Sequence, residues 1–178
     1  TVNDDEVLGF LGPNGAGKST TMNIIAGYLS STSGTVKVNG HDILEEPELA
    51  KKDIGYLPEN PPLYNDMTVD EYLDFICDLK GVAKSKRKNM LEKIISMVKI
   101  SDVTDRLIGN LSKGYKQRVG IAQAMVGNPS ILILDEPTVG LDPSQIIEIR
   151  KLIKSLSKSH SIILSSHILP EIQEVADR

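Results

Sequence analysis

The sequence predicts an α/β fold in which helices flank a mostly parallel sheet. Strand-length apolar patterns alternate with helical patterns along the chain, as in folds whose parallel strands are joined by crossover helices. Ile131–Leu134 is a continuous apolar run, which is typical of a strand covered on both faces. A glycine-rich turn joins the first strand pattern to the first helical pattern.

Local patterns indicate where each element begins and ends. Thr68 and Glu71 are spaced as a capping box, and Asp142-Pro143 places a capping carboxylate before a proline at the first helical position. Asn39-Gly40 indicates a tight turn after a strand, and Gly127-Asn128-Pro129 ends a helix. The predicted strands are 7–11, 35–38, 54–57, 130–134 and 161–165; the predicted helices run from the glycine-rich turn to about 29, from 68 to about 99, from 112 to 126, from 142 onward and from about 170.

The alternation of strands and helices is interrupted once, by a block that contains only helical patterns. We therefore expect a single domain over residues 1–178, with a core of about 1–66 and 128–178 and a helical insertion of about 67–127. The basic run Lys84–Lys88 lies at a polar helix start and is interpreted as a solvated face.

Composition narrows the class of protein. The chain has 24 acidic and 20 basic residues and a net charge of −4, which argues against a protein whose main task is to neutralise nucleic-acid phosphates. Cys77 is the only cysteine, so no internal disulfide is possible, and a reducing compartment is expected. No apolar run approaches the roughly 18 residues needed to cross a bilayer.

The glycine-rich turn carries the strongest motif of the chain. Gly12-Pro13-Asn14-Gly15-Ala16-Gly17-Lys18-Ser19 matches G-x-x-x-x-G-K-S/T at every fixed position and lies between a strand and a helix. Glycines let backbone N–H groups approach phosphates at a helix N-terminus, Lys18 can reach the β- and γ-phosphates, and Ser19 can bind Mg²⁺. The alternative to a phosphate-binding loop is a glycine-rich turn that a lysine follows by chance.

Two carboxylates follow the apolar strand that ends at Leu134. Ligands of open α/β sheets lie at the carboxyl ends of the strands, so Asp135 and Glu136 are expected to face the glycine-rich turn. Asp135 would hold Mg²⁺, and Glu136 would polarise the attacking water. The alternatives are a strand-end cap for Asp135 and a bystander carboxylate for Glu136.

With these motifs, the sequence resembles the ATP-binding-cassette (ABC) ATPases over nearly its whole length, which implies a P-loop NTPase fold. The signature segment, Leu111-Ser112-Lys113-Gly114-Tyr115, is similar to the Leu-Ser-Gly-Gly-Gln signature of that family. The resemblance implies that Ser112 and Gly114 contact the γ-phosphate bound on a second copy. Gly140-Leu141-Asp142 resembles the family's dimer-interface loop, and Ser165-Ser166-His167 resembles the segment of the switch histidine, which bonds the γ-phosphate. Without the resemblance, His167 would be interpreted as a surface histidine or a helix-capping histidine.

Two positions depart from the family pattern. Glu59 stands where the family usually has glutamine, so its carboxylate would approach Mg²⁺ while adding a negative charge. Lys113 and Tyr115 alter the signature segment, and lysine there could add a charged contact to phosphate. The segment 56–64 and this signature are similar to the ATPase subunits of ABC-2-type exporters, including gliding-motility types.

The resemblance implies hydrolysis of ATP, with Mg²⁺, in a head-to-tail dimer of two ATPase copies, either identical or different. A separate ABC-2-type membrane permease is the expected partner, which places the chain at the cytoplasmic face of the cell membrane, and no nucleic acid is expected. The catalytic residues implied are Lys18, Glu136 and His167; the nucleotide-binding residues are Gly12–Thr20, Glu59, Ser112, Gly114 and Asp142; the Mg²⁺ ligands are Ser19, Asp135 and Glu59.

Two other functions remain open at the level of sequence. The first is an ABC-type ATPase that acts on nucleic acid or ribosomes, which the net charge of −4 disfavours. Chromosome-maintenance relatives carry a long coiled coil between the glycine-rich turn and the signature, whereas Lys18 and Ser112 are only 112 − 18 = 94 positions apart, with no long heptad run between them. Translation-associated relatives carry two cassettes per chain, and one is visible in this sequence. The second is a cassette that binds nucleotide with weak hydrolysis. The family usually places an aromatic residue for adenine stacking before the glycine-rich turn, and Phe10 lies within a strand. We therefore expect a domain truncated at both ends.

Overall fold

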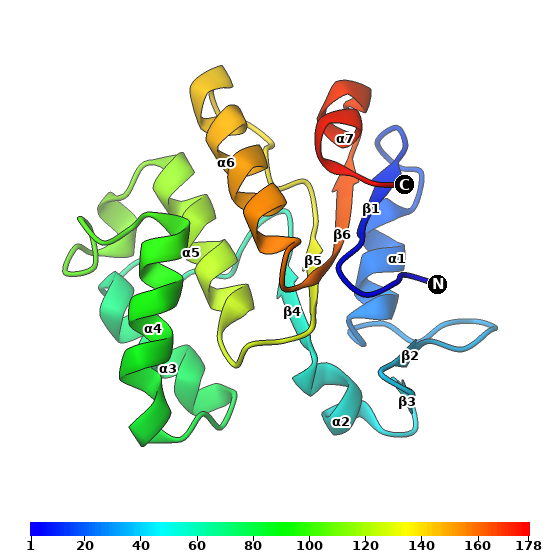
Figure 1. Cartoon of the computed structure of the whole chain (residues 1–178), viewed down its shortest axis with the longest axis horizontal. Helices are drawn as coiled ribbons and strands as arrows, with labels where there is room; N and C mark the ends of the chain where they lie inside the picture. The colour runs from blue at the N-terminus through cyan, green and yellow to red at the C-terminus, as the bar shows by residue number, and fades with distance from the viewer.

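A computed structural model describes all 178 residues (Figure 1). Its central sheet has four parallel strands in the order β1–β6–β5–β4, formed by Val7–Leu11, Ser161–Ser166, Ile131–Leu134 and Ile54–Leu57. The register pairs Leu11 with Ser166 and Leu57 with Leu134. All four strands therefore end at one edge of the sheet, and the segments that follow them become neighbours.

Helices cover both faces of this sheet, so the predicted α/β class is confirmed. One face packs against α1 (Lys18–Ile25), α2 (Pro47–Lys52) and the hairpin of β2 (Lys37–Val38) and β3 (His41–Asp42). The other face packs against α3 (Val69–Leu79), α4 (Lys84–Val98), α5 (Lys113–Met125), α6 (Pro143–Leu156) and α7 (Leu169–Val175), with a short 3₁₀ helix at Ile108–Asn110. No helix combines the length and the apolar character that a membrane span requires.

The strand β5 lies between two hydrophobic cores, as its continuous apolar run predicts. Leu132 and Leu134 belong to the larger cluster of 29 buried residues, whereas Ile133 belongs to the smaller cluster of 8. Successive side chains of a strand point to opposite faces, so only a strand with both faces buried needs an unbroken apolar sequence. The two cores fix β5, and with it the position of the acidic residues that follow.

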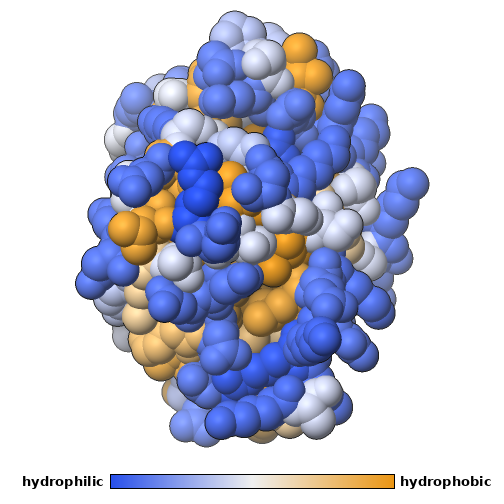
Figure 2. Space-filling model, turned by 90° about the vertical axis from the view of Figure 1, so that its left-hand side faces the viewer, coloured by the Kyte–Doolittle hydropathy of each residue, from blue (hydrophilic) through white to orange (hydrophobic).

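The helices α3, α4 and α5 lie together at one side of the molecule (Figure 1). Their outer face is mostly hydrophilic, with separate apolar patches (Figure 2). The continuous helix expected from 68 to about 99 is wrong, because α3 ends at Leu79 and α4 begins at Lys84. Gly81 adopts a left-handed φ of 64°, and the Val82 N–H bonds to the Cys77 carbonyl at 2.9 Å, as in a glycine-terminated helix end.

The basic run at the start of α4 is not wholly solvated, which corrects the sequence interpretation at Arg87. This side chain is only 9% exposed, and its guanidinium bonds to Asp74 at 3.1 Å and to Asp78 at 2.5 Å. Its Nε also donates to the Val82 carbonyl at 2.9 Å. Arg87 therefore joins α4 to α3 and to the turn between them.

The remaining boundaries differ little from the predicted ones. The helix α1 ends at Ile25 rather than near Leu29, because Gly27 is a poor helix former. The capping box at Thr68 and Glu71 is present, and Asp142 caps α6 by accepting a bond from the Gln145 N–H at 3.0 Å.

Candidate functional site

The glycine loop, residues 12–17, connects β1 to α1 at the edge where the parallel strands end. Gly15 and Gly17 have φ angles of 81° and 90°, and a Cβ atom added at either would meet no atom within 4 Å. No side chain caps the N-terminus of α1, so the N–H groups of its first turn stay free. An open glycine backbone that precedes free N–H groups fits a phosphate chain.

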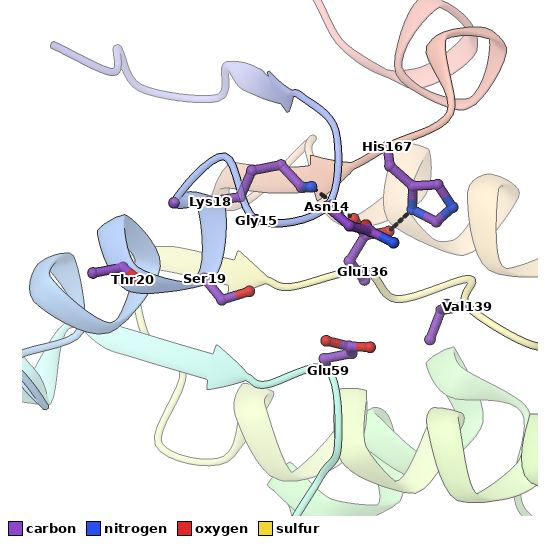
Figure 3. A pocket seen from close by; sticks show the side chains of 10 residues that line it. Asn14, Gly15, Lys18, Ser19, Thr20, Glu59, Glu136, Val139 and His167 are labelled. Atoms are coloured by element: carbon purple, nitrogen blue, oxygen red, sulfur yellow. Dashed lines mark hydrogen bonds and ion pairs between the residues drawn. The ribbon is translucent and has the colours of Figure 1, made fainter.

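A cavity of about 380 Å³ lies beside this loop (Figure 3). We call it the loop cavity. The segments that follow β4, β5 and β6 also contribute to its wall. The lining residues are Asn14, Gly15, Gly17, Lys18, Ser19, Thr20, Glu59, Glu136, Val139 and His167. All of them except Val139 were predicted as site residues, whereas Gly12, Pro13 and Ala16, also predicted, lie in the loop without lining the cavity.

Glu136 lies between a lysine and a histidine at the centre of the loop cavity (Figure 3). Its Oε1 is 3.4 Å from Lys18 Nζ, and both side chains are 7% exposed. Its Oε2 is 2.9 Å from His167 Nδ1, which is the donor because a carboxylate only accepts. Oε1 has no hydrogen-bond partner although it is buried. This atom is therefore available to a further donor, such as a water molecule.

Lys18 also contacts the glycine loop itself. Its Nζ donates to the carbonyls of Gly12 at 2.8 Å and Pro13 at 3.2 Å. A buried ammonium needs partners, and these two carbonyls with Glu136 supply them. The amine thus lies at the loop, where it can exchange these contacts for phosphate oxygens.

The backbone of Glu136 is strained. Its φ is 49°, a left-handed value that costs a residue with a side chain on the order of 1–3 kcal/mol. Ser165 supports this conformation, because its Oγ accepts the Glu136 N–H at 2.8 Å and donates to Asp135 Oδ1 at 2.5 Å. One hydroxyl therefore orients both acidic residues.

The predicted Mg²⁺ ligands offer oxygen atoms from three segments. Ser19 and Glu59 line the loop cavity, whereas Asp135 is 2% exposed, is held by Ser165 and does not line the cavity. No group of three or more carboxylate, histidine or cysteine side chains forms a complete metal cage. Hydroxyl and carboxylate oxygens fit Mg²⁺, which is usually held by one or two carboxylates together with phosphates and water.

Sequence reasoning missed Val139, which lines the loop cavity, and two residues near it, Glu171 and Arg150. Glu171 lies in the first turn of α7 and is 4% exposed, with its carboxylate bonded to Thr138 and Ser166 and paired with Arg150 of α6. Acidic residues are common in the first turn of a helix because they interact favourably with its dipole, so no local pattern indicates these contacts.

A family model described as "ABC transporter" matches residues 1–139. The chain belongs to the ABC transporter family. Bacitracin transport ATP-binding protein BcrA of Bacillus licheniformis is 40% identical to this cassette in an alignment that covers 99% of the cassette and 57% of BcrA. The cassette spans rather more than half the length of the curated bacterial relatives that it matches, 58% and 57% for two of them.

Solved ABC structures have the same fold. The structure of cbiO1 from Clostridium perfringens, described as part of the transporter complex cbiONQ, has a TM-score of 0.89 and 29% identity, covering 99% of this cassette and 73% of that chain. The dimeric structure of MJ0796, described as a bacterial ABC transporter cassette, has a TM-score of 0.82 and 26% identity, covering 98% of this cassette and 80% of that chain.

The signature segment lines a separate cavity of about 240 Å³, which we call the signature cavity. Ser112 caps α5, accepting the Tyr115 N–H at 3.4 Å, and Gly114 is buried against Gln145 of α6. The signature cavity shares no lining residue with the loop cavity. Asp142 lines neither cavity, and its carboxylate is occupied as the cap of α6.

The departure at Tyr115 has a structural role in the cassette. Its hydroxyl donates to Asp102 Oδ2 at 2.6 Å, and this bond lowers the pKa of Asp102 below its ordinary value of 3.8. Because the folded-state pKa is lowered, the bond stabilises the fold above about pH 3.8, and its contribution is lost as the pH falls through the lowered pKa.

Tyr115→Phe is therefore expected to raise the pKa of Asp102 toward 3.8. Titration of the side-chain carboxyl carbons by NMR measures this change. Tyr28→Phe, a substitution of an exposed tyrosine in another part of the chain, is the control and leaves that pKa unchanged. An unaltered titration of Asp102 in Tyr115→Phe contradicts the assignment of the bond.

Proposed function

We propose that this cassette binds ATP with Mg²⁺ and hydrolyses it to drive a membrane permease on a separate chain. One observation carries the proposal. The loop cavity brings the glycine loop, Lys18, Glu136 and His167 together from three different segments. Hydrolysis needs phosphate binding, charge stabilisation and an oriented water, and these groups can supply all three.

The main polar groups at and beside the loop cavity have separate roles in this proposal. The N–H groups of the glycine loop and Lys18 bind the phosphates, and His167 steadies the γ-phosphate. The Oε1 of Glu136, which is paired with Lys18 at 3.4 Å but accepts no hydrogen bond, orients the attacking water and accepts its proton. Ser19, Asp135 and Glu59 would hold Mg²⁺, whose chemistry is to neutralise charge on the phosphates.

Two copies of the cassette complete the site. Ser112 and Gly114 line the signature cavity, apart from the loop cavity of the same copy. We infer a head-to-tail dimer in which the signature segment of one copy covers the nucleotide of the other. The description of the MJ0796 structure as dimeric supports the pairing of two copies.

The inferred permease is of the ABC-2 type, which would place the cassette at the cytoplasmic face of the membrane. The description of cbiO1 as part of a transporter complex and the name of BcrA support a membrane partner. The segment Glu59–Met67 is the proposed contact, and its Tyr64 is 50% exposed while packing edge-on against Phe75. An ATPase acting on nucleic acid or ribosomes has less support, since these relatives are named for transport.

Complementation between two inactive variants tests the dimer and the activity together. Lys18→Ala and Gly114→Asp each damage both sites of a homodimer, whereas a mixed dimer keeps one intact site. Random pairing of equal amounts should restore about one quarter of the unaltered turnover, because half of the dimers are mixed and each has one intact site of two. Phosphate release measures this recovery. No turnover by the unaltered chain would refute hydrolysis, and no recovery in the mixture would refute head-to-tail pairing.

A further inference from the structure

The buried carboxylate of Glu171 connects the helix α6 to two segments that contribute residues to the loop cavity. Its Oε2 accepts hydrogen bonds from Thr138 Oγ1 at 2.6 Å and from Ser166 Oγ at 3.0 Å. Its Oε1 lies 3.5 Å from a guanidinium nitrogen of Arg150. With 4% exposure, Glu171 depends on these partners rather than on water.

Two of these partners lie beside the residues at the centre of the loop cavity. Thr138 is two positions after Glu136, and Ser166 immediately precedes His167. The Ser166 hydroxyl also accepts the Ile168 N–H at 3.1 Å, so the residues on both sides of His167 are fixed to one hydroxyl. Glu171 thus constrains the backbone of the segment that carries Glu136 and of the segment that carries His167.

The bond between Glu136 and His167 depends on the relative position of these segments. Their side chains meet at 2.9 Å, but they come from loops that follow different strands, β5 and β6. A displacement of about 1 Å would lengthen the bond beyond hydrogen-bonding distance. A buried acceptor shared by both segments is a direct way to prevent this displacement.

We propose that Glu171 is a positioning residue that holds Glu136 and His167 in the relative arrangement required for hydrolysis, an inference that rests on the proposed function. Glu171 does not line the loop cavity and touches neither Lys18 nor the glycine loop. It acts on the step in which water is oriented, and it does not act on the affinity for nucleotide.

The neighbouring residue Glu174 supplies a matched control. It lies on the same helix and pairs with the same Arg150, at 2.6 Å. Its side chain is 61% exposed, and it bonds to neither Thr138 nor Ser166. Removing the carboxylate of Glu174 therefore removes a contact with Arg150 but does not disturb the segments that carry Glu136 and His167.

The test compares Glu171→Met with Glu174→Met in the full chain, because methionine removes both carboxylate oxygens at nearly constant size, whereas glutamine would keep an acceptor for Thr138 and Ser166. Glu171→Met is expected to lower kcat by about 10–100-fold, as the loss of a supporting hydrogen-bond partner does, with KM and the affinity for a fluorescent ATP analogue within about twofold of the unaltered chain. Glu174→Met leaves all three quantities unchanged. An unchanged kcat in Glu171→Met, or an equal loss of affinity and turnover, overturns the proposal.

A second readout does not require activity. The imidazole NMR signals of His167 should shift in Glu171→Met and in Thr138→Val, which removes one donor at nearly constant size, but not in Glu174→Met. Thr138→Val serves as the test variant if Glu171→Met does not fold. Unmoved His167 signals in a folded variant overturn the positioning role, whereas absent turnover by the unaltered chain, with these shifts present, overturns hydrolysis alone.

Discussion

Glu136→Gln is expected to lower ATP turnover by about 10²–10⁴-fold, the range that a positioned general base supplies. Glutamine keeps the size of the side chain and tolerates the same left-handed backbone, so the change isolates the loss of the carboxylate. Nucleotide affinity should persist, because the glycine loop and Lys18 are unaltered. A nucleotide-bound dimer should then accumulate, and size-exclusion chromatography with ATP detects it beside the phosphate-release assay.

Glu45→Gln is a suitable control for this substitution, because Glu45 is exposed and lies outside the loop cavity. It should leave both turnover and dimerisation unchanged. Unchanged hydrolysis in Glu136→Gln would assign the base elsewhere. Equally slow turnover in the unaltered chain would instead identify a cassette that binds nucleotide with weak hydrolysis.

Lys18→Ala is expected to weaken nucleotide binding by about 10–100-fold, since charge-assisted hydrogen bonds contribute about 1.5–3 kcal/mol. Lys18 is the only basic side chain apart from His167 that lines the loop cavity, so no neighbouring amine replaces it. Titration with a fluorescent ATP analogue measures the loss.

The matched control for Lys18→Ala is Lys151→Ala, which removes an exposed lysine of α6. The affinity of Lys151→Ala for the ATP analogue should equal that of the unaltered chain. An affinity of Lys18→Ala within twofold of the unaltered chain would mean that the backbone N–H groups hold the phosphates without the lysine.

Much of the candidate site could be predicted because its residues follow strands. Parallel strands end at one edge, so Glu59, Glu136 and His167 meet the glycine loop although they are distant in sequence. The alternation of patterns likewise predicted the α/β class and the four strands of the central sheet, but it missed β3 and α2 and merged α3 with α4. In each case a local pattern determines the element, and the parallel topology brings the segments that follow the strands to one edge of the sheet.

Other features depend on tertiary contacts that no local pattern encodes. Arg87 reads as one member of a basic run, and only the packing of α4 on α3 buries it between two aspartates. Glu171 reads as an ordinary first-turn acid until α7 packs beside β6. The left-handed backbone of Glu136 is equally hidden, because glutamate rarely adopts it and neighbouring contacts impose it.

The charges around the loop cavity have a consequence for the form of ligand that it admits. One lysine lines it together with two carboxylates, Glu59 and Glu136, so the wall has no excess of fixed positive charge. A bare triphosphate would bring several negative charges toward these carboxylates and be repelled at short range. A triphosphate already paired with a divalent cation arrives with part of that charge cancelled. We therefore expect the cavity to favour a ligand that brings its own counter-ion.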